Sequence, residues 1–223
     1  MVLAWRSMSN LYNRQIVNQN KDLSFNLLVA VVFLTVIVPF ASVFLFKAKL
    51  PFFFYLFLFA IARAIYVVAK VYNSFSLKIS RSIDAQEKIG KKLTELPSSW
   101  RFETNISLPN LGELDFLVFG PGEKIFAIEV KSHFGEVLMV QEKLKRKIND
   151  KIISFEKDFI RQVELETKAV KELRGFKEVT SVLLFSNATL DLKDKVKIRD
   201  VYILGLNDLN EFLVNYNSAL VAV

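Results

Sequence analysis

The 223-residue chain has no cysteine and only one histidine, His133. Without cysteine the chain can form neither disulfide bonds nor thiolate metal sites, which is consistent with a reducing compartment. Glycine is also scarce, and no glycine-rich loop joins a strand to a helix, so a motif for nucleotide hydrolysis is absent from the sequence. Gly120, Gly122 and Gly135 are therefore expected to serve turn geometry.

Acidic residues are almost absent from the first third of the chain. Residues 1–73 hold seven Lys or Arg and one acid, whereas residues 74–223 hold 23 Lys or Arg and 22 acids. The formal net charge of +7 thus divides into +6 and +1. Basic residues beside membrane spans are explained by topology, so the basic pI does not by itself indicate nucleic-acid binding.

Two long apolar segments lie in this basic region. Residues 23–46 have no ionisable side chain and would extend about 36 Å as a helix, enough to cross the hydrocarbon core of a bilayer. After Lys47-Ala48-Lys49, residues 50–70 form a second apolar segment. We therefore predict a transmembrane helical hairpin over 23–72 that contacts the lipid bilayer.

Arg63 is the one charged residue inside the second span, which ends at Lys70. Placing it in lipid costs roughly 2.5 kcal/mol or more, so it is expected to be an interface anchor or to contact a helix of a second copy or of another membrane protein. A transport role usually needs several such charges, and we reject it.

The flanking charges predict the orientation of the hairpin. Six Lys or Arg residues lie beside its outer ends and two lie in its connection. The six are Arg6, Arg14, Lys21, Lys70, Lys78 and Arg81. By the positive-inside rule, the N-terminal segment 1–22 and the C-terminal domain both lie in the cytoplasm, which predicts a multi-pass protein of the cell (inner) membrane.

The rest of the chain predicts an α/β domain over residues 83–214, with helices around a mixed sheet. A polar segment, 73–82, precedes it as a linker or a helical extension, and a tail, 215–223, follows it. The expected helices cover residues 83–96, 155–173 and 209–214. The expected strands cover residues 100–108, 113–119, 124–131, 136–141, 179–185 and 201–204.

Three charged residues lie on a predicted β-hairpin within this domain. Glu129 and Lys131 are two apart and share a strand face, and reflection through the turn places Asp115 within one residue of Glu129. Close carboxylates repel each other unless they are protonated or bridged by a cation, and such oxygen ligands suit Mg²⁺ or Mn²⁺. The alternative is a solvated ion pair at a strand end. However, the apolar run 125–128 predicts a strand covered on both faces, where charges need partners.

The same residues carry a family resemblance. Gly112-Glu-Leu-Asp-Phe-Leu-Val-Phe-Gly-Pro121, Phe126-Ala-Ile-Glu-Val-Lys-Ser132 and Gly135 resemble the nuclease-related (NERD) domain, which is related to the restriction-endonuclease-like PD-(D/E)xK nucleases. The resemblance covers roughly residues 83–213. It implies a restriction-endonuclease-like core and a metal-dependent deoxyribonuclease.

The resemblance also implies roles for individual residues. Asp115, Glu129 and Val130 would be the metal ligands, and Lys131 the catalytic lysine. Glu87 on the first helix and Gln162 on a later helix resemble two further site residues. Where the family often has glycine before that glutamate, this chain has Gln86, which affects how closely the helix can approach.

A basic run follows the hairpin and could contact a nucleic-acid backbone. Its candidate residues, together with the histidine, are Lys143, Lys145, Arg146, Lys147 and His133. Charge runs are usually solvated faces, and a lone histidine is more often a packing residue, so both alternatives stay open.

Two functions from different classes are consistent with these observations. The leading hypothesis is a membrane-anchored, Mg²⁺-dependent nuclease that hydrolyses phosphodiester bonds of DNA at the cytoplasmic face, in DNA processing or in defence against foreign DNA. The alternative is a non-catalytic binding or scaffold module that keeps the fold and is tethered to the membrane.

Overall fold

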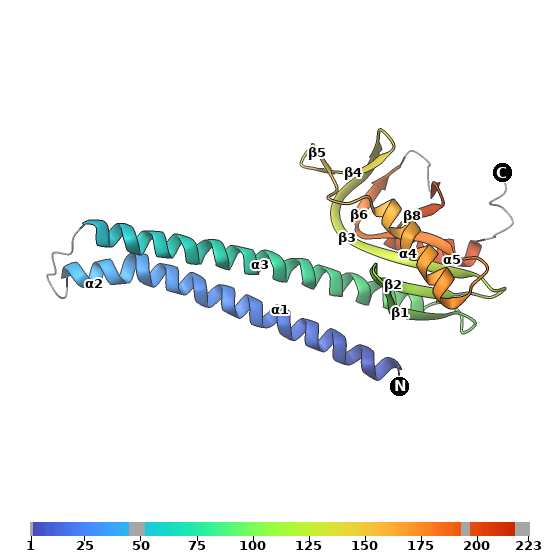
Figure 1. Cartoon of the computed structure of the whole chain (residues 1–223), viewed down its shortest axis with the longest axis horizontal. Helices are drawn as coiled ribbons and strands as arrows, with labels where there is room; N and C mark the ends of the chain where they lie inside the picture. Colours follow the sequence, from blue (N-terminus) through green and yellow to red (C-terminus); the bar gives the residue numbers. More distant parts are fainter. Residues whose placement is uncertain (1, 45–51, 193–196, 217–223) are drawn as a thin grey trace. The chain divides into compact units, whose positions relative to one another are not determined.

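The computed structural model describes residues 2–44, 52–192 and 197–216, and the chain divides into two compact units, 1–83 and 84–223 (Figure 1). Each unit is described by itself. The predicted connection at Lys47–Lys49 and most of the predicted tail, residues 217–223, lie outside the described residues.

Long helices make up the first unit. They are α1 (Val2–Val32), a π-helical turn (Phe33–Ile37), α2 (Val38–Phe44) and the first part of α3 (Phe52–Thr94). The π-helical turn directly precedes Pro39, whose ring and missing N–H are incompatible with regular α-helical hydrogen bonding to the preceding turn.

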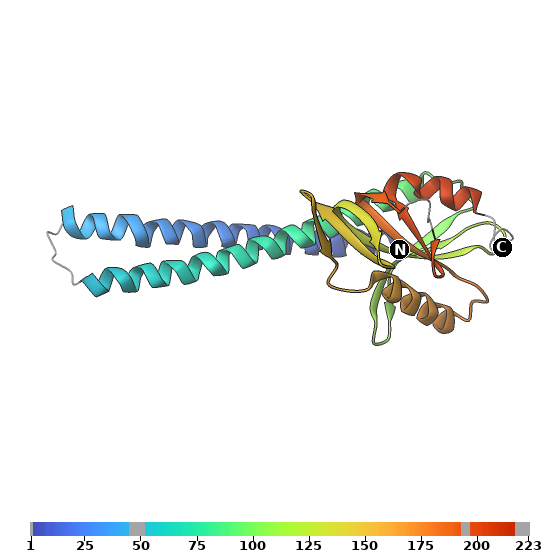
Figure 2. The same cartoon turned by 90° about the horizontal axis from the view of Figure 1, so that it is seen from above.

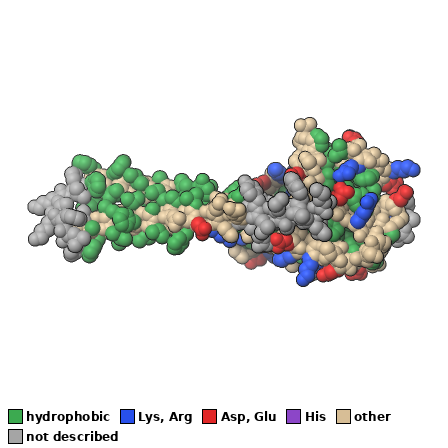
Figure 3. All heavy atoms as spheres, turned by 90° about the horizontal axis from the view of Figure 1, so that it is seen from below, with side chains coloured by type: hydrophobic (Ala, Val, Ile, Leu, Met, Phe, Trp, Pro, Cys, Tyr) green, Lys and Arg blue, Asp and Glu red, His purple; other side chains and the backbone are tan. Residues whose placement is uncertain are grey.

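Two helical stretches are long and apolar enough to cross a membrane, Gln15–Ala41 and Phe53–Thr94. Their large apolar side chains are exposed, for example Phe25 at 65% and Phe57 at 62%. Hydrophobic side chains accordingly cover the helices of this unit in Figure 3. The length and composition of these helices agree with the predicted spans.

Helix α3 continues without a break through residues 73–82, so of the two alternatives for this segment the helical extension is correct. The segment has no proline or glycine, and its serines bond to the preceding helical turn: Ser74 Oγ donates to Val71 O and Ser76 Oγ to Tyr72 O. These bonds satisfy the hydroxyls without opening the helix. The helix ends at Thr94, shortly before Pro97.

The second unit is built around a mixed eight-stranded sheet, which confirms the predicted α/β class. Its central order is β1-β2-β3-β6-β8-β7, with β4 paired to β3 and β5 to β4. The pairs β3–β6 and β6–β8 are parallel and the others antiparallel. The strands are β1 (Arg101–Leu108), β2 (Gly112–Phe119), β3 (Ile125–Val140), β4 (Lys143–Ile148), β5 (Lys151–Ser154), β6 (Thr180–Asp191), β7 (Lys197–Ile198) and β8 (Val201–Gly205).

Helices cover both faces of this sheet. On one face, the end of α3 and α5 (Leu209–Asn215) pack against alternate residues of the strands, such as Phe116 and Ile128. On the other face, α4 (Phe159–Arg174) packs against the intervening residues, such as Leu117 and Ala127. Figure 2 shows α4 and α5 on opposite sides of the strands. The run Ile125–Ile128 is covered on both faces, as predicted.

Several predicted boundaries are wrong. The strand expected over 179–185 is β6, which continues to Asp191. The expected strand 136–141 is the second half of β3, which continues through a bulge between Lys131 and Phe134. Gly135, at a φ of +98°, allows the strand to resume beyond the bulge. Helix α4 begins four residues later than expected, because Asp158 caps it by accepting the N–H of Arg161 over 3.0 Å.

Candidate active site

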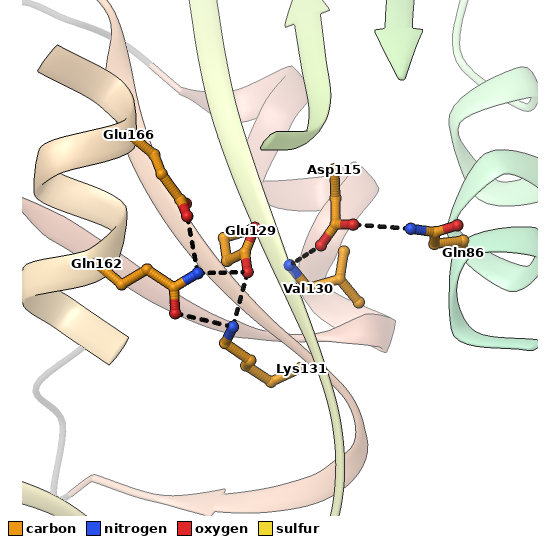
Figure 4. Close-up of polar contacts among 7 residues, drawn as sticks. All are labelled: Gln86, Asp115, Glu129, Val130, Lys131, Gln162 and Glu166. Atoms are coloured by element: carbon orange, nitrogen blue, oxygen red, sulfur yellow. Dashed lines mark hydrogen bonds and ion pairs between the residues drawn. The ribbon is translucent and has the colours of Figure 1, made fainter. Parts of the chain in front are cut away.

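The site lies where β2 and β3 separate. Their regular pairing ends at Phe116–Ile128, and the side chain of Asp115 then takes the place of a backbone acceptor. Its Oδ2 accepts the Val130 N–H over 2.8 Å, while its Oδ1 accepts from Gln86 Nε2 over 2.7 Å (Figure 4). Asp115 is thereby fixed between the third strand and the end of α3.

Glu129 and Lys131 lie on the α4 face of β3, two residues apart as predicted. The Lys131 Nζ donates to Glu129 Oε1 over 2.7 Å and lies 4.6 Å from the centre of the Phe159 ring. Glu129 is 6% exposed, and its second oxygen, Oε2, is buried without a hydrogen-bond partner among the described residues. One oxygen of this carboxylate is thus engaged, and the other is buried near the carboxyl group of Glu166.

Helix α4 contributes Gln162, which links both charges. Its Nε2 donates to Glu129 Oε1 over 3.0 Å, and its Oε1 accepts from Lys131 Nζ over 3.1 Å. The same Nε2 donates to Glu166 Oε1 over 2.7 Å. Figure 4 shows Gln162 pointing from α4 toward Glu129 and Lys131 of β3, and Glu166 pointing toward the Gln162 amide.

Burial and like charges dominate the electrostatics of the site. Burial raises the pKa of Glu129 to about 8, with a further contribution from the charge of Asp115, and together these outweigh the lowering by Lys131. Burial also raises the pKa of Glu166. Both pKa values are therefore raised mainly by burial, and the negative charge of Asp115 adds to both shifts.

The donor set fits a divalent cation. Mg²⁺ is usually held by one or two carboxylates and keeps several waters. Asp115 and Glu129 are therefore enough protein ligands for it. The buried, unpartnered Oε2 of Glu129 is the observation that favours a cation here. Within the described ranges, no group of three or more His, Asp or Glu side chains is arranged to hold a metal.

The helix residue that touches the carboxylate pair differs from the expected one. Glu87 was expected to approach the site from α3, but it is exposed, and the neighbouring Gln86 contacts Asp115 instead. The two residues lie about 100° apart around a helix, so only one can face the strand end. A catalytic role for Glu87 stays a prediction.

The candidate nucleic-acid residues divide between two faces. In β4, Lys143, Lys145 and Lys147 alternate with Leu144 and Arg146. Leu144 packs in the α4 core cluster, and the Arg146 guanidinium carbon lies 6.0 Å from the ring centre of Phe155 and 5.8 Å from that of Phe134. Arg146 is thus a packed residue, whereas the three lysines share the opposite face.

His133 packs against aromatic rings, with ring-centre distances of 5.1 Å to Phe155 and 5.4 Å to Phe159. Lys147 is paired with Glu136 at 4.0 Å and with Asp150 at 3.4 Å. Lys143 and Lys145 are therefore the members of the basic run best placed to meet an external anion.

A comparison with known families identifies the domain. The model of the nuclease-related domain matches residues 81–186. This segment is a nuclease-related domain. It contains the strand-end carboxylates, Lys131 and the α4 residues described above. No curated protein and no solved structure matches the chain.

Two residues of the nuclease-related domain's site, Gln86 and Glu166, were missed by the sequence reasoning. The sequence did not distinguish Gln86 as a site residue, because its helical pattern would equally allow the neighbouring Glu87 to face the site. Glu166 did have one: the buried face of α4 is apolar at Phe159, Ile160, Val163 and Val170, and Glu166 interrupts it at helical spacing. A carboxylate within an apolar stripe marks a site candidate.

Proposed function

We propose that this nuclease-related domain is a Mg²⁺- or Mn²⁺-dependent deoxyribonuclease that hydrolyses phosphodiester bonds. The observations that support the proposal are the Glu129–Lys131 pair on β3 and Asp115, which accepts the N–H of the intervening Val130. One buried carboxylate oxygen of Glu129 also has no hydrogen-bond partner among the described residues. The family match supports a nuclease-like function for the same residues.

Each side chain has a distinct task in this proposal. Asp115 and Glu129 would hold the cation, together with the backbone of Val130, whose N–H donates to Asp115 just beyond the last pair of β2 and β3. When bound, such a cation supplies Lewis acidity for phosphodiester hydrolysis. Lys131 carries a positive charge beside Glu129, where it would stabilise negative charge on the scissile phosphate. Gln162 would orient Lys131 and Glu129 through its amide.

The two apolar helices would tether this activity to the cell (inner) membrane. We propose that both ends of the hairpin lie in the cytoplasm, because six of the eight flanking or connecting Lys and Arg residues lie beside those ends. The domain would then act on DNA at the cytoplasmic face, in DNA processing or in defence against foreign DNA.

The lysine face of β4, formed by Lys143, Lys145 and Lys147, would contact the DNA backbone. Charge reversal at Lys143 and Lys145 would weaken binding, since each lost phosphate contact lowers affinity and reduces its salt dependence. Reversal of Lys168, an exposed lysine paired with Glu172 on α4, is the matched control.

A cleavage assay tests the proposal. The full chain, purified in a mild detergent, would be incubated with plasmid and linear DNA, and separately with RNA, in Mg²⁺, Mn²⁺ or EDTA. We expect metal-dependent cleavage of DNA that is lost in Glu129→Ala.

One observation favours the non-catalytic alternative, a membrane-tethered binding or scaffold module: both oxygens of Asp115 already accept hydrogen bonds from the protein. Failure to cleave any substrate, together with no measurable Mn²⁺ binding, would support that module and contradict the nuclease.

A further inference from the structure

Glu166 is a buried carboxylate that no task in the proposed reaction uses. It is 2% exposed, and it lies on the face of α4 that packs against the sheet. Burying a carboxylate is costly, and an apolar residue of similar size at this position would be neutral or stabilising. A buried charge that does not serve the packing of the helix requires another explanation.

The contacts of Glu166 supply such an explanation. The Gln162 amide has three polar contacts: Nε2 donates to Glu166 Oε1 at 2.7 Å and to Glu129 Oε1 at 3.0 Å, while Oε1 accepts from Lys131 Nζ at 3.1 Å (Figure 4). Both amide hydrogens therefore point at carboxylates, and the amide oxygen points at the ammonium. The contact to Glu166 is the shortest of the three.

This arrangement determines which way the amide faces. Rotating it by 180° would set its oxygen against two carboxylates and its NH₂ group against Lys131, so three favourable contacts would become three repulsive ones. Without Glu166, the Nε2 group would be held by Glu129 alone, the same carboxylate that is available to a cation. Glu166 gives the amide an anchor independent of Glu129.

We propose that Glu166 is a positioning residue that acts through Gln162, holding its amide so that Lys131 and Glu129 keep their relative placement during the reaction. This inference deepens the proposed nuclease function and rests on it. Glu166 itself touches neither substrate nor cation in this proposal.

A double-mutant cycle on the full chain in detergent tests the proposal by activity. Glu166→Met should lower the single-turnover cleavage rate by about tenfold. This is in the range typical of residues that orient metal ligands through hydrogen bonds without touching the metal. Glu166→Gln should recover most of the rate, because its oxygen can still accept from Gln162. In a Gln162→Met background, Glu166→Met should change the rate less than about twofold, since the two residues act as one unit. If Glu166→Met lowers the cleavage rate by the same factor in the Gln162→Met background as in the wild type, the two residues act independently. That result would overturn the proposal.

A second readout needs neither cleavage nor metal. In the full chain labelled with ¹⁵N-glutamine, the side-chain amide signals of Gln162 can be assigned by their loss in Gln162→Met. Glu166→Met should shift one amide proton of this pair strongly. The matched controls, Thr167→Val beside it in the buried face and Glu172→Met on the exposed face, should not.

The two readouts separate the failure modes. If the wild-type chain cleaves nothing, the proposed function fails, and the amide signals alone decide whether Glu166 holds Gln162. Unshifted Gln162 signals in a folded Glu166→Met chain would overturn the positioning role even if cleavage falls.

Discussion

The backbone N–H of Val130 donates to Oδ2 of Asp115 over 2.8 Å, so a side chain continues the hydrogen bonding where the backbones of β2 and β3 have separated. The separation makes room for polar groups beside two buried strand segments, residues 116–118 and 126–128. It also places one carboxylate on each side of the gap, because Asp115 belongs to β2 and Glu129 to β3. The candidate site therefore forms where the backbone hydrogen bonding between β2 and β3 ends.

Glu129→Ala and Lys131→Ala should both abolish cleavage but differ in metal affinity. Glu129→Ala removes a ligand, so Mn²⁺ affinity should fall together with activity. Lys131→Ala removes a positive charge 2.7 Å from Glu129 Oε1, so Mn²⁺ binding should persist or strengthen while turnover is lost. Calorimetric Mn²⁺ titration and cleavage rates of the same preparations check this. Unchanged cleavage in both variants would place the active site elsewhere.

The stability of the metal-free protein should fall as the pH rises from about 5 to about 8. The pKa of Glu129 is raised to about 8 in the folded chain from 4.5, so the folded state holds a proton that the unfolded state has lost. This contribution is complete below pH 4.5 and disappears as the pH passes the folded pKa, a loss of at most about 5 kcal/mol.

Denaturation of the full chain in EDTA at several pH values measures this loss. Glu129→Gln should flatten the profile, and Mn²⁺ should restore stability at the alkaline end by binding the ionised form. A profile of the same slope in wild type and Glu129→Gln would contradict the assignment.

Gly135→Ala should destabilise the domain, whereas Gly90→Ala should stabilise it. A Cβ on Gly135 would lie 2.5 Å from the carbonyl oxygen of Lys147, at a φ of +98°, so β4 must shift. The expected cost is roughly 1–3 kcal/mol. Gly90 lies in α3 with no atom within 4 Å of an added Cβ, and alanine there should add about 0.5–1 kcal/mol. Melting temperatures of the two variants give the comparison.

External protease should spare the C-terminal domain in intact cells and digest it in inverted membrane vesicles. The prediction follows from the charge bias around the two apolar helices. Digestion of the domain in intact cells, with the hairpin connection protected, would reverse the topology.

Much of the fold was predictable from local sequence patterns, because those patterns reflect burial on two faces. The run Ile125–Ile128 is apolar at every position, and it is a strand with a helix on each side. The charged hairpin of β4 and β5 was not recognised. Its inward face includes Arg146, which is half-buried against the rings of Phe134 and Phe155 outside β4, so no apolar alternation is visible.

The sequence by itself determined the kinds of groups at the site and their approximate register. Asp115, Glu129 and Lys131 follow from strand alternation and reflection through a turn, both of which are local geometry. Only the tertiary structure decided which helix residues complete the site. Gln86 rather than Glu87 reaches Asp115, and Gln162 reaches Glu129 and Lys131, because the rotation of a helix about its axis is set by how its apolar face packs on the sheet. That packing depends on residues far apart in the chain, and no local pattern encodes it.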